Sequence, residues 1–271
     1  MKERIRNQIT AFIHDNPANR LPESGTPYFD QPLVGFAAAT DTLFTDYQRI
    51  IGPFHLLPTD LLPEAVSVIS WVLPFNRAIR ESNRKETGLP SREWAMGRYH
   101  GEIINGSLRR HLVAWLEEQG IKAVAPQYAP LWQELGNTPV GIASTWSERH
   151  AAYAAGLGTF SLSDGFITTK GIAHRCGSVI TALPLAPTPR TAPNHTHNCL
   201  FHRNGSCGLC IDRCPVGAIT AAEHDKSRCR ELVYGTAPQA LSQRYDVPQT
   251  GCGLCQTRVP CEAQIPPDKG L

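Results

Sequence analysis

Hydrophobic positions recur along the chain with two different periods, and each period predicts a different kind of element. Near the N-terminus, Ile5, Ile9, Phe12 and Ile13 stand at helical spacing, which predicts a helix with one buried face. Over residues 65–73 the apolar positions alternate instead, as they do in a strand. Helical and strand patterns are therefore both present in the first part of the chain.

A second helix is predicted before Gly120, where four apolar residues of segment 107–119 share one face: Leu108, Leu112, Trp115 and Leu116. Residues 121–125 and 179–185 read as further strands. Thr145 and Glu148 have the spacing of a capping box, which predicts a helix through Ala155 that Gly156 ends in a left-handed turn. The mixed-charge stretch 77–98 is predicted to be an exposed loop.

Interleaved strands and helices of this kind predict a layered α/β domain. Cysteine is absent before Cys176, and the other eight cysteines all lie between Cys199 and Cys261. This change in composition falls near the proline-rich stretch 183–193. We therefore expect two domains, an α/β domain over residues 1–190 and a cysteine-rich domain over residues 191–271.

Composition and charge narrow the possible functions. With 271 residues, 41% of them hydrophobic, and a formal charge of +2, the chain can form a core but has no concentrated basic face for nucleic acid. The longest apolar run, 65–75, is too short to cross a bilayer, and the N-terminus lacks the apolar block of a secretory signal. These features predict a cytoplasmic protein without a membrane partner, and clustered cysteines in that reducing compartment typically hold metal.

The cysteines form two groups with the spacing of iron–sulfur ligands. The first reads Cys199, then Cys207-Gly-Leu-Cys210-Ile-Asp-Arg-Cys214-Pro215, and the second comprises Cys229, Cys252-Gly-Leu-Cys255 and Cys261. A short C-x2-C turn wraps the backbone around one cluster, while a cysteine that precedes proline reaches the other cluster in two-cluster ferredoxins. Eight such thiolates suit two 4Fe–4S clusters.

The position of Cys214 before Pro215 slightly favours crossed pairing of the ligands. One cluster would then be held by Cys214, Cys229, Cys252 and Cys255, and the other by Cys199, Cys207, Cys210 and Cys261. Crossed pairing also places both irregularly spaced ligands, Cys199 and Cys261, on one cluster. Local pairing remains the alternative.

Three other interpretations of these residues stay open. Two structural zinc sites would also use C-x2-C hooks, although a zinc ribbon does not need the C-x3-C-P continuation. His195, His197 and His202 lie near Cys199 and are alternative ligands to it. Cys176 stands apart in an apolar strand, and its default interpretation is core packing.

Several blocks beyond the cysteines resemble the epoxyqueuosine reductase family, which is related to reductive dehalogenases. They are Leu-Pro-Glu-Ala-Val-Ser-Val-Ile-Ser at 62–70, Gly-Arg-Tyr-His at 97–100, Glu148-Arg149, and Ala-Gly-Leu-Gly at 155–158. The resemblance implies a nitroreductase-like, cobalamin-binding α/β domain followed by a bacterial-ferredoxin-like domain. It implies cobalamin and two 4Fe–4S clusters as cofactors.

The sequence departs from that family at the place of its catalytic acid. The family keeps an aspartate upstream of the Glu-Arg pair, and the corresponding position here is Ile142, with no acidic residue between Gly136 and Ser147. Reduction of an epoxide requires a proton as well as electrons, so this departure argues against epoxyqueuosine reduction. The family's helical-repeat extension for tRNA does not follow Cys261, which argues against specific tRNA binding.

Two functions therefore compete. In the first, the chain passes electrons through two clusters to a bound cobalamin or corrinoid, with a ferredoxin or flavodoxin as electron donor. In the second, it is a cobalamin-dependent reductase of an organic substrate. The resemblance places Tyr99, His100, Glu148 and Arg149 near the corrin or substrate, together with Gly156 and Gly158. Alternatively, Tyr99 and His100 cap a helix, and Glu148 only completes the capping box.

Overall fold

The computed structural model describes residues 1–268. Its helices are α1 (Lys2–Asp15), α2 (Thr42–Ile50), α3 (Pro58–Leu61), α4 (Arg77–Arg84), α5 (Arg92–Glu117), η1 (Pro126–Tyr128), α6 (Glu148–Ala154), α7 (Leu200–Asn204), α8 (Leu209–Asp212), α9 (Lys226–Arg230), η2 (Glu231–Thr236), α10 (Ala237–Tyr245) and η3 (Leu254–Gln256). Its strands are β1 (Leu33–Ala38), β2 (Ser67–Pro74), β3 (Ala123–Val124), β4 (Glu134–Thr138), β5 (Gly141–Ser144), β6 (Gly158–Phe160), β7 (Phe166–Thr168) and β8 (His174–Thr181).

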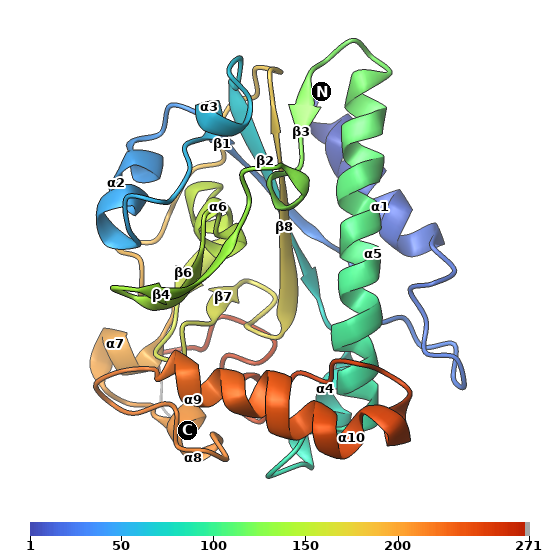
Figure 1. The fold of residues 1–271 in the computed structure, drawn as a ribbon, viewed down its shortest axis with the longest axis vertical. Helices are drawn as coiled ribbons and strands as arrows, with labels where there is room; N and C mark the ends of the chain where they lie inside the picture. Colours follow the sequence, from blue (N-terminus) through green and yellow to red (C-terminus); the bar gives the residue numbers. More distant parts are fainter. Residues whose placement is uncertain (269–271) are drawn as a thin grey trace.

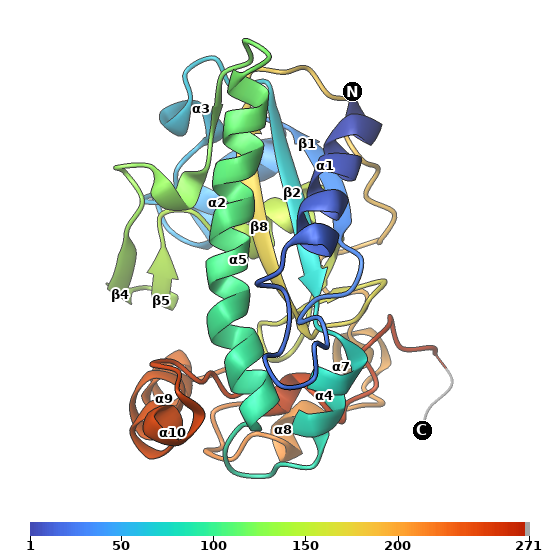
Figure 2. The ribbon, with the colours of Figure 1, turned by 90° about the vertical axis from the view of Figure 1, so that its right-hand side faces the viewer.

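A four-stranded antiparallel sheet in the order β1-β2-β8-β3 forms the centre of the molecule (Figure 1). Helices α1 and α5 lie side by side on one face of this sheet (Figure 2), and α6 packs against the other face. Every residue of β2 is buried, because helices cover the sheet on both sides. The layered arrangement of helices and sheet confirms the predicted α/β fold class.

Several local predictions are confirmed. The N-terminal helix forms as α1 and buries Ile5, Ile9 and Ile13. The alternating segment 65–73 becomes β2, and the two further strand segments overlap β3 and β8. Strand β8 begins earlier than predicted, because its first half pairs with the end of β2.

The predicted loop over 77–98 is wrong, because the segment contains α4 and the first two turns of α5. Asn76 caps α4 by accepting a hydrogen bond from the backbone N–H of Ala78 (2.9 Å), and Ser91 caps α5 in the same way from Trp94 (3.2 Å). Helix α5 therefore starts fifteen residues before the predicted start at 107. Glycine lowers helix propensity, but a Cβ at Gly101 would come within 2.6 Å of the ring of Phe29, so tight packing requires it there.

The predicted capping box at α6 is also wrong. The hydroxyl of Thr145 instead donates to the carbonyl of Leu131 (3.1 Å), while Glu148 points away from the helix start toward α5. The predicted left-handed turn at Gly156 is confirmed, with φ of +72°.

The cysteine-rich segment packs along the lower ends of α4 and α5, where α9, η2 and α10 form one continuous rod across the molecule (Figure 1). The side-chain amide of Asn83 donates to the carbonyl of Cys252 (3.2 Å), and Arg84 pairs with the buried carboxylate of Glu262 (2.7 Å). None of the helices in the described part of the chain combines the length and apolarity that crossing a bilayer requires.

Candidate functional site

Four cysteine thiols from the starts of α7 and α8, from α8 itself and from the C-terminal turns lie around one small apolar cavity. They are Cys199, Cys207, Cys210 and Cys261, and the apolar side chains of Ile167, Ile172 and Val259 complete much of its wall. Burial, followed by the neighbouring Cys199 and Cys207, raises the pKa of the Cys210 thiol to about 12. Burial is also the largest cause of the raised pKa of Cys261, followed by the same neighbours.

The other four cysteines, Cys214, Cys229, Cys252 and Cys255, form a second neighbourhood. Burial raises the pKa of Cys252 to about 11, with further contributions from Cys229 and Cys214, and it raises the pKa of Cys255 well above its usual value. The backbone N–H of Ala218 points at the sulfur of Cys214 (3.2 Å). Cys255 also borders the cavity of the first group, so the two groups adjoin.

The chemistry of these donors fits metal-bound thiolates. A buried thiol resists ionisation, but a bound cationic centre deprotonates it outright, so raised pKa values are the expected state of such cysteines without metal. Four thiolates per group match both a 4Fe–4S cluster and a four-cysteine zinc site. Among residues 1–268, no three His, Cys, Asp or Glu side chains come close enough together to bind one shared metal ion.

The spatial grouping is the one that crossed pairing predicts. Cys214 lies beside Cys252 and Cys229, although it is closer in sequence to Cys210. The two irregularly spaced cysteines, Cys199 and Cys261, fall in the same group. None of the three histidines considered as alternative ligands lines the thiol cavity. The ligand assignment itself stays a prediction.

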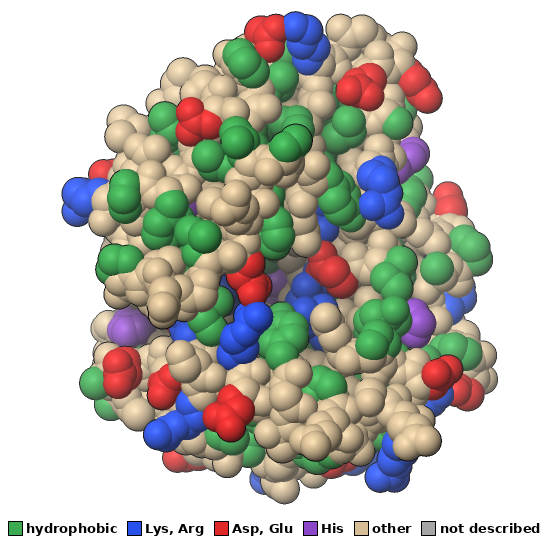
Figure 3. All heavy atoms as spheres, in the orientation of Figure 1, with side chains coloured by type: hydrophobic (Ala, Val, Ile, Leu, Met, Phe, Trp, Pro, Cys, Tyr) green, Lys and Arg blue, Asp and Glu red, His purple; other side chains and the backbone are tan. Residues whose placement is uncertain are grey.

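A larger cavity of about 850 Å³ opens beside the second group of cysteines. Figure 3 shows the hollow on this face of the molecule, with acidic and basic side chains gathered around it. Its wall comes from α5, α6, β4, β8 and the rod of α9, η2 and α10. Gln249 and Gln256 also line it, and Gln256 directly follows Cys255, so the cavity adjoins the cysteine segment.

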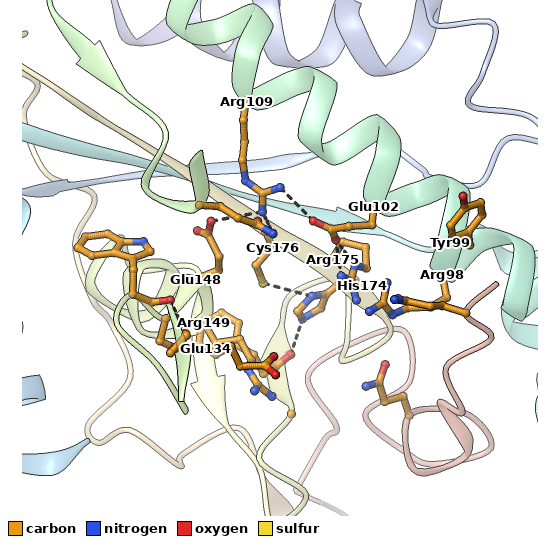
Figure 4. Close-up of a pocket in the computed structure, with 18 of the residues that line it drawn as sticks. Arg98, Tyr99, Glu102, Arg109, Glu134, Glu148, Arg149, His174, Arg175 and Cys176 are labelled. Atoms are coloured by element: carbon orange, nitrogen blue, oxygen red, sulfur yellow. Dashed lines mark hydrogen bonds and ion pairs between the residues drawn. The ribbon is translucent and has the colours of Figure 1, made fainter. Parts of the chain in front are cut away.

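A network of charged side chains crosses the inner wall of this cavity (Figure 4). The Glu102 carboxylate on α5 pairs with Arg109, two turns further along the same helix (3.0 Å), and with Arg175 on β8 (2.9 Å). Burial opposes ionisation of Glu102, but Arg175 and Arg109 together lower its pKa to about 2. Glu102 is therefore a permanently charged anchor for two guanidinium groups.

Glu148 is the second carboxylate of this network. It accepts a hydrogen bond from the Ser178 hydroxyl (2.5 Å) and lies 3.3 Å from Arg109, and its side chain is 19% exposed. Burial raises its pKa, and the attraction of Arg109 offsets this only in part. Glu148 thus lies at the edge of the cavity, held in place by Ser178 and Arg109.

Cys176 faces the cavity beside His174, which corrects its interpretation as a core residue. The ring of His174 uses Nε2–H to donate to the carbonyl of Phe166 (2.6 Å), and burial lowers the pKa of His174 to about 4. The neutral ring therefore presents Nδ1 as an acceptor to the Cys176 sulfur, 3.5 Å away. Burial raises the pKa of Cys176 to about 12, so the thiol keeps its proton.

Three of the residues expected near a corrin or substrate line the large cavity, namely Tyr99, Glu148 and Arg149. His100 does not line it, because its ring stacks on Tyr28 instead, with centroids 6.0 Å apart. It also lies inside α5 and caps no helix.

Gly156 and Gly158 border a separate cavity of about 280 Å³. A Cβ at Gly156 would approach the carbonyl of Pro189 to 2.8 Å, and one at Gly158 would approach that of Ile167 to 2.3 Å. Both glycines allow close backbone packing. Ile142 lies on β5 and lines a shallow depression beside the large cavity, together with Glu134 and Tyr234.

Sequence reasoning missed most of the polar wall, namely Arg98, Glu102, Arg109, His174 and Arg175, and it assigned Cys176 to the core. A signal for part of it was present, because positions 98, 102 and 109 are four and seven residues apart and share one helical face. Treating residues 77–98 as a loop concealed this pattern.

Comparisons with known proteins support the fold. No family model matches the sequence, and a sequence search of curated proteins finds no significant match. Among solved structures, the epoxyqueuosine reductase of Streptococcus thermophilus matches with a TM-score of 0.58 at 15% identity, over 97% of this chain and 66% of that one. An epoxyqueuosine reductase with a tRNA stem loop matches with a TM-score of 0.57 at 19% identity, over 98% and 68%.

A reductive dehalogenase structure that suggests a mechanism for B12-dependent dehalogenation matches with a TM-score of 0.55 at 15% identity, over 86% of this chain and 30% of that one. The chain thus spans about two thirds of the length of the epoxyqueuosine reductases. The expected resemblance to these two groups of enzymes is confirmed at the level of the fold.

Proposed function

We propose that this chain is an iron–sulfur redox protein that passes electrons through two 4Fe–4S clusters to a corrinoid in the 850 Å³ cavity. The observation that carries the proposal is the position of this cavity directly beside one of two adjoining groups of four thiols. Electrons would enter from a ferredoxin or flavodoxin type of donor and cross from one group to the other.

The first cluster would be held by Cys199, Cys207, Cys210 and Cys261, and the second by Cys214, Cys229, Cys252 and Cys255. Each cluster supplies a one-electron redox centre when bound. The protein's contribution is to bury these centres and to hold them close together. Cys255 borders the first thiol cavity and precedes Gln256 in the wall of the large one, so the second cluster would stand between the first and the corrinoid.

The large cavity fits a planar, amide-fringed cofactor. Its volume lies within the range of about 300–1,000 Å³ that is typical of ligand sites. The half-buried aromatic side chains of Tyr99 and Trp132 offer flat apolar surfaces, and Gln127, Gln249 and Gln256 offer amide partners at its edge. A bound corrinoid would supply a metal centre that accepts single electrons, while these residues orient it and exclude water.

A titration of the anaerobic protein with hydroxocobalamin tests this proposal. The absorption spectrum of the corrinoid should change with a saturable dependence on protein, and a reductant that first reduces the clusters should then reduce the bound corrinoid. Trp132→Ala removes a half-buried flat surface of the cavity and should weaken binding without changing the iron content. An unchanged corrinoid spectrum at all protein concentrations would contradict the proposal.

The second candidate function, a cobalamin-dependent reductase of an organic substrate, is favoured by Glu148. Ile142 cannot donate a proton and lies outside the large cavity, but Glu148 lines that cavity with a raised pKa. Its carboxyl would hold a proton near a reacting atom, and Ser178 and Arg109 would fix its orientation.

Anaerobic turnover of epoxyqueuosine-containing tRNA by the chain, with added cobalamin and a strong reductant, separates the two functions. A pure electron carrier gives no product. If product forms, Glu148→Gln should lower the rate by about 10²–10⁴-fold, because it removes the proton donor. Product formation that is unaffected by this substitution would assign the proton to another group.

A further inference from the structure

The charges that face the large cavity do not balance. Among residues 1–268, five guanidinium groups line it, those of Arg98, Arg109, Arg149, Arg175 and Arg230, but only three carboxylates do, those of Glu102, Glu134 and Glu148. Glu134 pairs with Arg230 at the rim (2.8 Å), which neutralises that arginine locally. The remaining four guanidinium groups share two carboxylates.

Arg98 and Arg149 have no carboxylate of residues 1–268 within ion-pairing distance, and of these two only Arg149 donates to a backbone carbonyl, that of Asp164. Within residues 1–268, the one hydrogen bond of the Arg98 side chain is a long one, 3.5 Å, to the hydroxyl of Tyr234. The neighbouring Arg175 is the largest cause of a lowered Arg98 pKa, to about 10, and burial adds to it. Two partly buried cations therefore repel one another across the wall of the cavity (Figure 4).

Such an arrangement stores unfavourable free energy, since a charge removed from water without a partner is destabilising. An anion between the two groups would relieve it. Guanidinium groups are suited to this task because their planar donors bind carboxylate and phosphate oxygens in pairs. The Arg109 Nε–H, buried and without a partner in the described structure, shows that the donors of this wall exceed its acceptors.

We propose that Arg98 and Arg175 form a binding subsite for an anionic group, a carboxylate or a phosphate, of the molecule that occupies the large cavity. This inference deepens the proposed function. It rests on the proposed function only for the identity of the molecule in the cavity. The anion has two possible sources, the phosphodiester of a corrinoid's nucleotide tail or an anionic group of an organic substrate. Both present the same oxygens to the two arginines.

The placement of Arg98 supports a ligand-binding role over a structural one. Arg98 projects from α5 at the level of Gly251, whose backbone packs against the Arg98 methylene groups, so its stem is fixed and its head faces the cavity. Arg175 is held by Glu102 through Nε and Nη2. Both side chains are therefore held at the cavity wall by contacts with the protein.

The first test measures thermal unfolding of the anaerobic full chain against inorganic phosphate at constant ionic strength, with chloride as the balancing anion. Phosphate should raise the unfolding temperature saturably, because it binds only the folded state. Arg98→Gln should weaken phosphate binding about tenfold or more, since it removes a charge-assisted hydrogen bond. Arg98→Lys should retain part of the effect, and Arg77→Gln, on the exposed face of α4, should leave it unchanged.

Without phosphate, Arg98→Gln should unfold at the same temperature as the unmodified chain or higher, because the repulsion from Arg175 is gone. If Arg98 had a structural role, its substitution would lower the unfolding temperature. A variant that is equally or more stable but binds phosphate more weakly therefore indicates a role in anion binding. The proposal is overturned if phosphate does not stabilise the unmodified chain relative to chloride. An equal response of the unmodified chain and Arg98→Gln would overturn it as well.

The second test identifies the source of the anion, using hydroxocobalamin and dicyanocobinamide, which lacks the nucleotide tail. Weaker binding of cobalamin alone by Arg98→Gln assigns the subsite to the tail phosphate. Unchanged binding of both assigns it to an anionic substrate, whereas equal weakening of both means that Arg98 contacts the corrin ring and overturns the anion subsite. If neither corrinoid binds the unmodified chain but Arg98→Gln still weakens phosphate binding, the proposed function fails and the subsite stands.

Discussion

A Cβ atom on Gly253 would lie 1.9 Å from the indole ring of Trp94, so the second C-x2-C turn and helix α5 touch backbone against ring. Gly253 also has a φ of +66°, in the left-handed region. The segment Cys252-Gly-Leu-Cys255 thus requires glycine at position 253 for two reasons, its backbone conformation and its contact with Trp94. This contact fixes the second thiol group against the domain that carries the large cavity.

We expect Gly253→Ala to destabilise the protein far more than Gly205→Ala. Gly205 has nearly the same φ, +70°, but no atom within 4 Å of an added Cβ, so its substitution isolates the backbone cost of about 1–2 kcal/mol. Gly253→Ala adds a steric cost of about 1–3 kcal/mol. Urea unfolding of both variants measures the difference, and equal losses would contradict the tight contact with Trp94.

Paired cysteine variants test the crossed arrangement. Cys199→Ala and Cys261→Ala should alter the same cluster signal in electron paramagnetic resonance, because both thiols border one cavity. Cys214→Ala and Cys229→Ala should alter the other signal. If Cys199→Ala and Cys261→Ala change different signals, local pairing holds instead.

Cys176 should be dispensable for iron binding. Its thiol lies against His174 in the large cavity, apart from both groups of four, so Cys176→Ala should leave the iron and sulfide content unchanged. Its raised pKa, about 12, also predicts slow alkylation by iodoacetamide at neutral pH, since the thiolate is the reactive form. Mass spectrometry after timed alkylation checks this rate, and loss of iron in Cys176→Ala would refute the assignment.

We expect the buried His55 side chain to lower the free energy of unfolding in mild acid. Burial between Tyr47 and Trp146 lowers its pKa from 6.5 to about 4, so the folded state binds its proton less readily than the unfolded state does. Its contribution is present above pH 6.5 and is lost as the pH falls from 6.5 toward 4, by about 3 kcal/mol at most. His55→Phe should flatten this part of the stability profile. An identical pH dependence in that variant would contradict the prediction.

Much of the fold was predictable because its patterns are local. The alternation over residues 65–73 predicts β2, and Ile5, Ile9 and Ile13 predict α1, since burial on one face sets each period. The start of α5 was missed because its early glycines weaken the helical signal. These glycines are required by close contacts with residues far away in sequence, such as Phe29.

The candidate site was predictable only in part, for the same physical reason. Cysteine spacing carries its own signal, because a C-x2-C turn is a local device. The cavity wall has no such signature. Glu102, Arg109, Glu148 and Arg175 come from α5, α6 and β8, and only the folded sheet brings their charges together. The spacing of Thr145 and Glu148 predicted a capping box instead, because the pairing of Glu148 with Arg109 is not visible in the sequence.

The central claim is that the eight clustered thiols hold two 4Fe–4S clusters. The most direct measurement is the content of iron, acid-labile sulfide and zinc in anaerobically purified protein, together with its absorption spectrum. We expect about eight irons and about eight sulfides per chain, with no stoichiometric zinc. About two zinc ions per chain without sulfide would contradict it and would assign the eight thiols to two structural zinc sites.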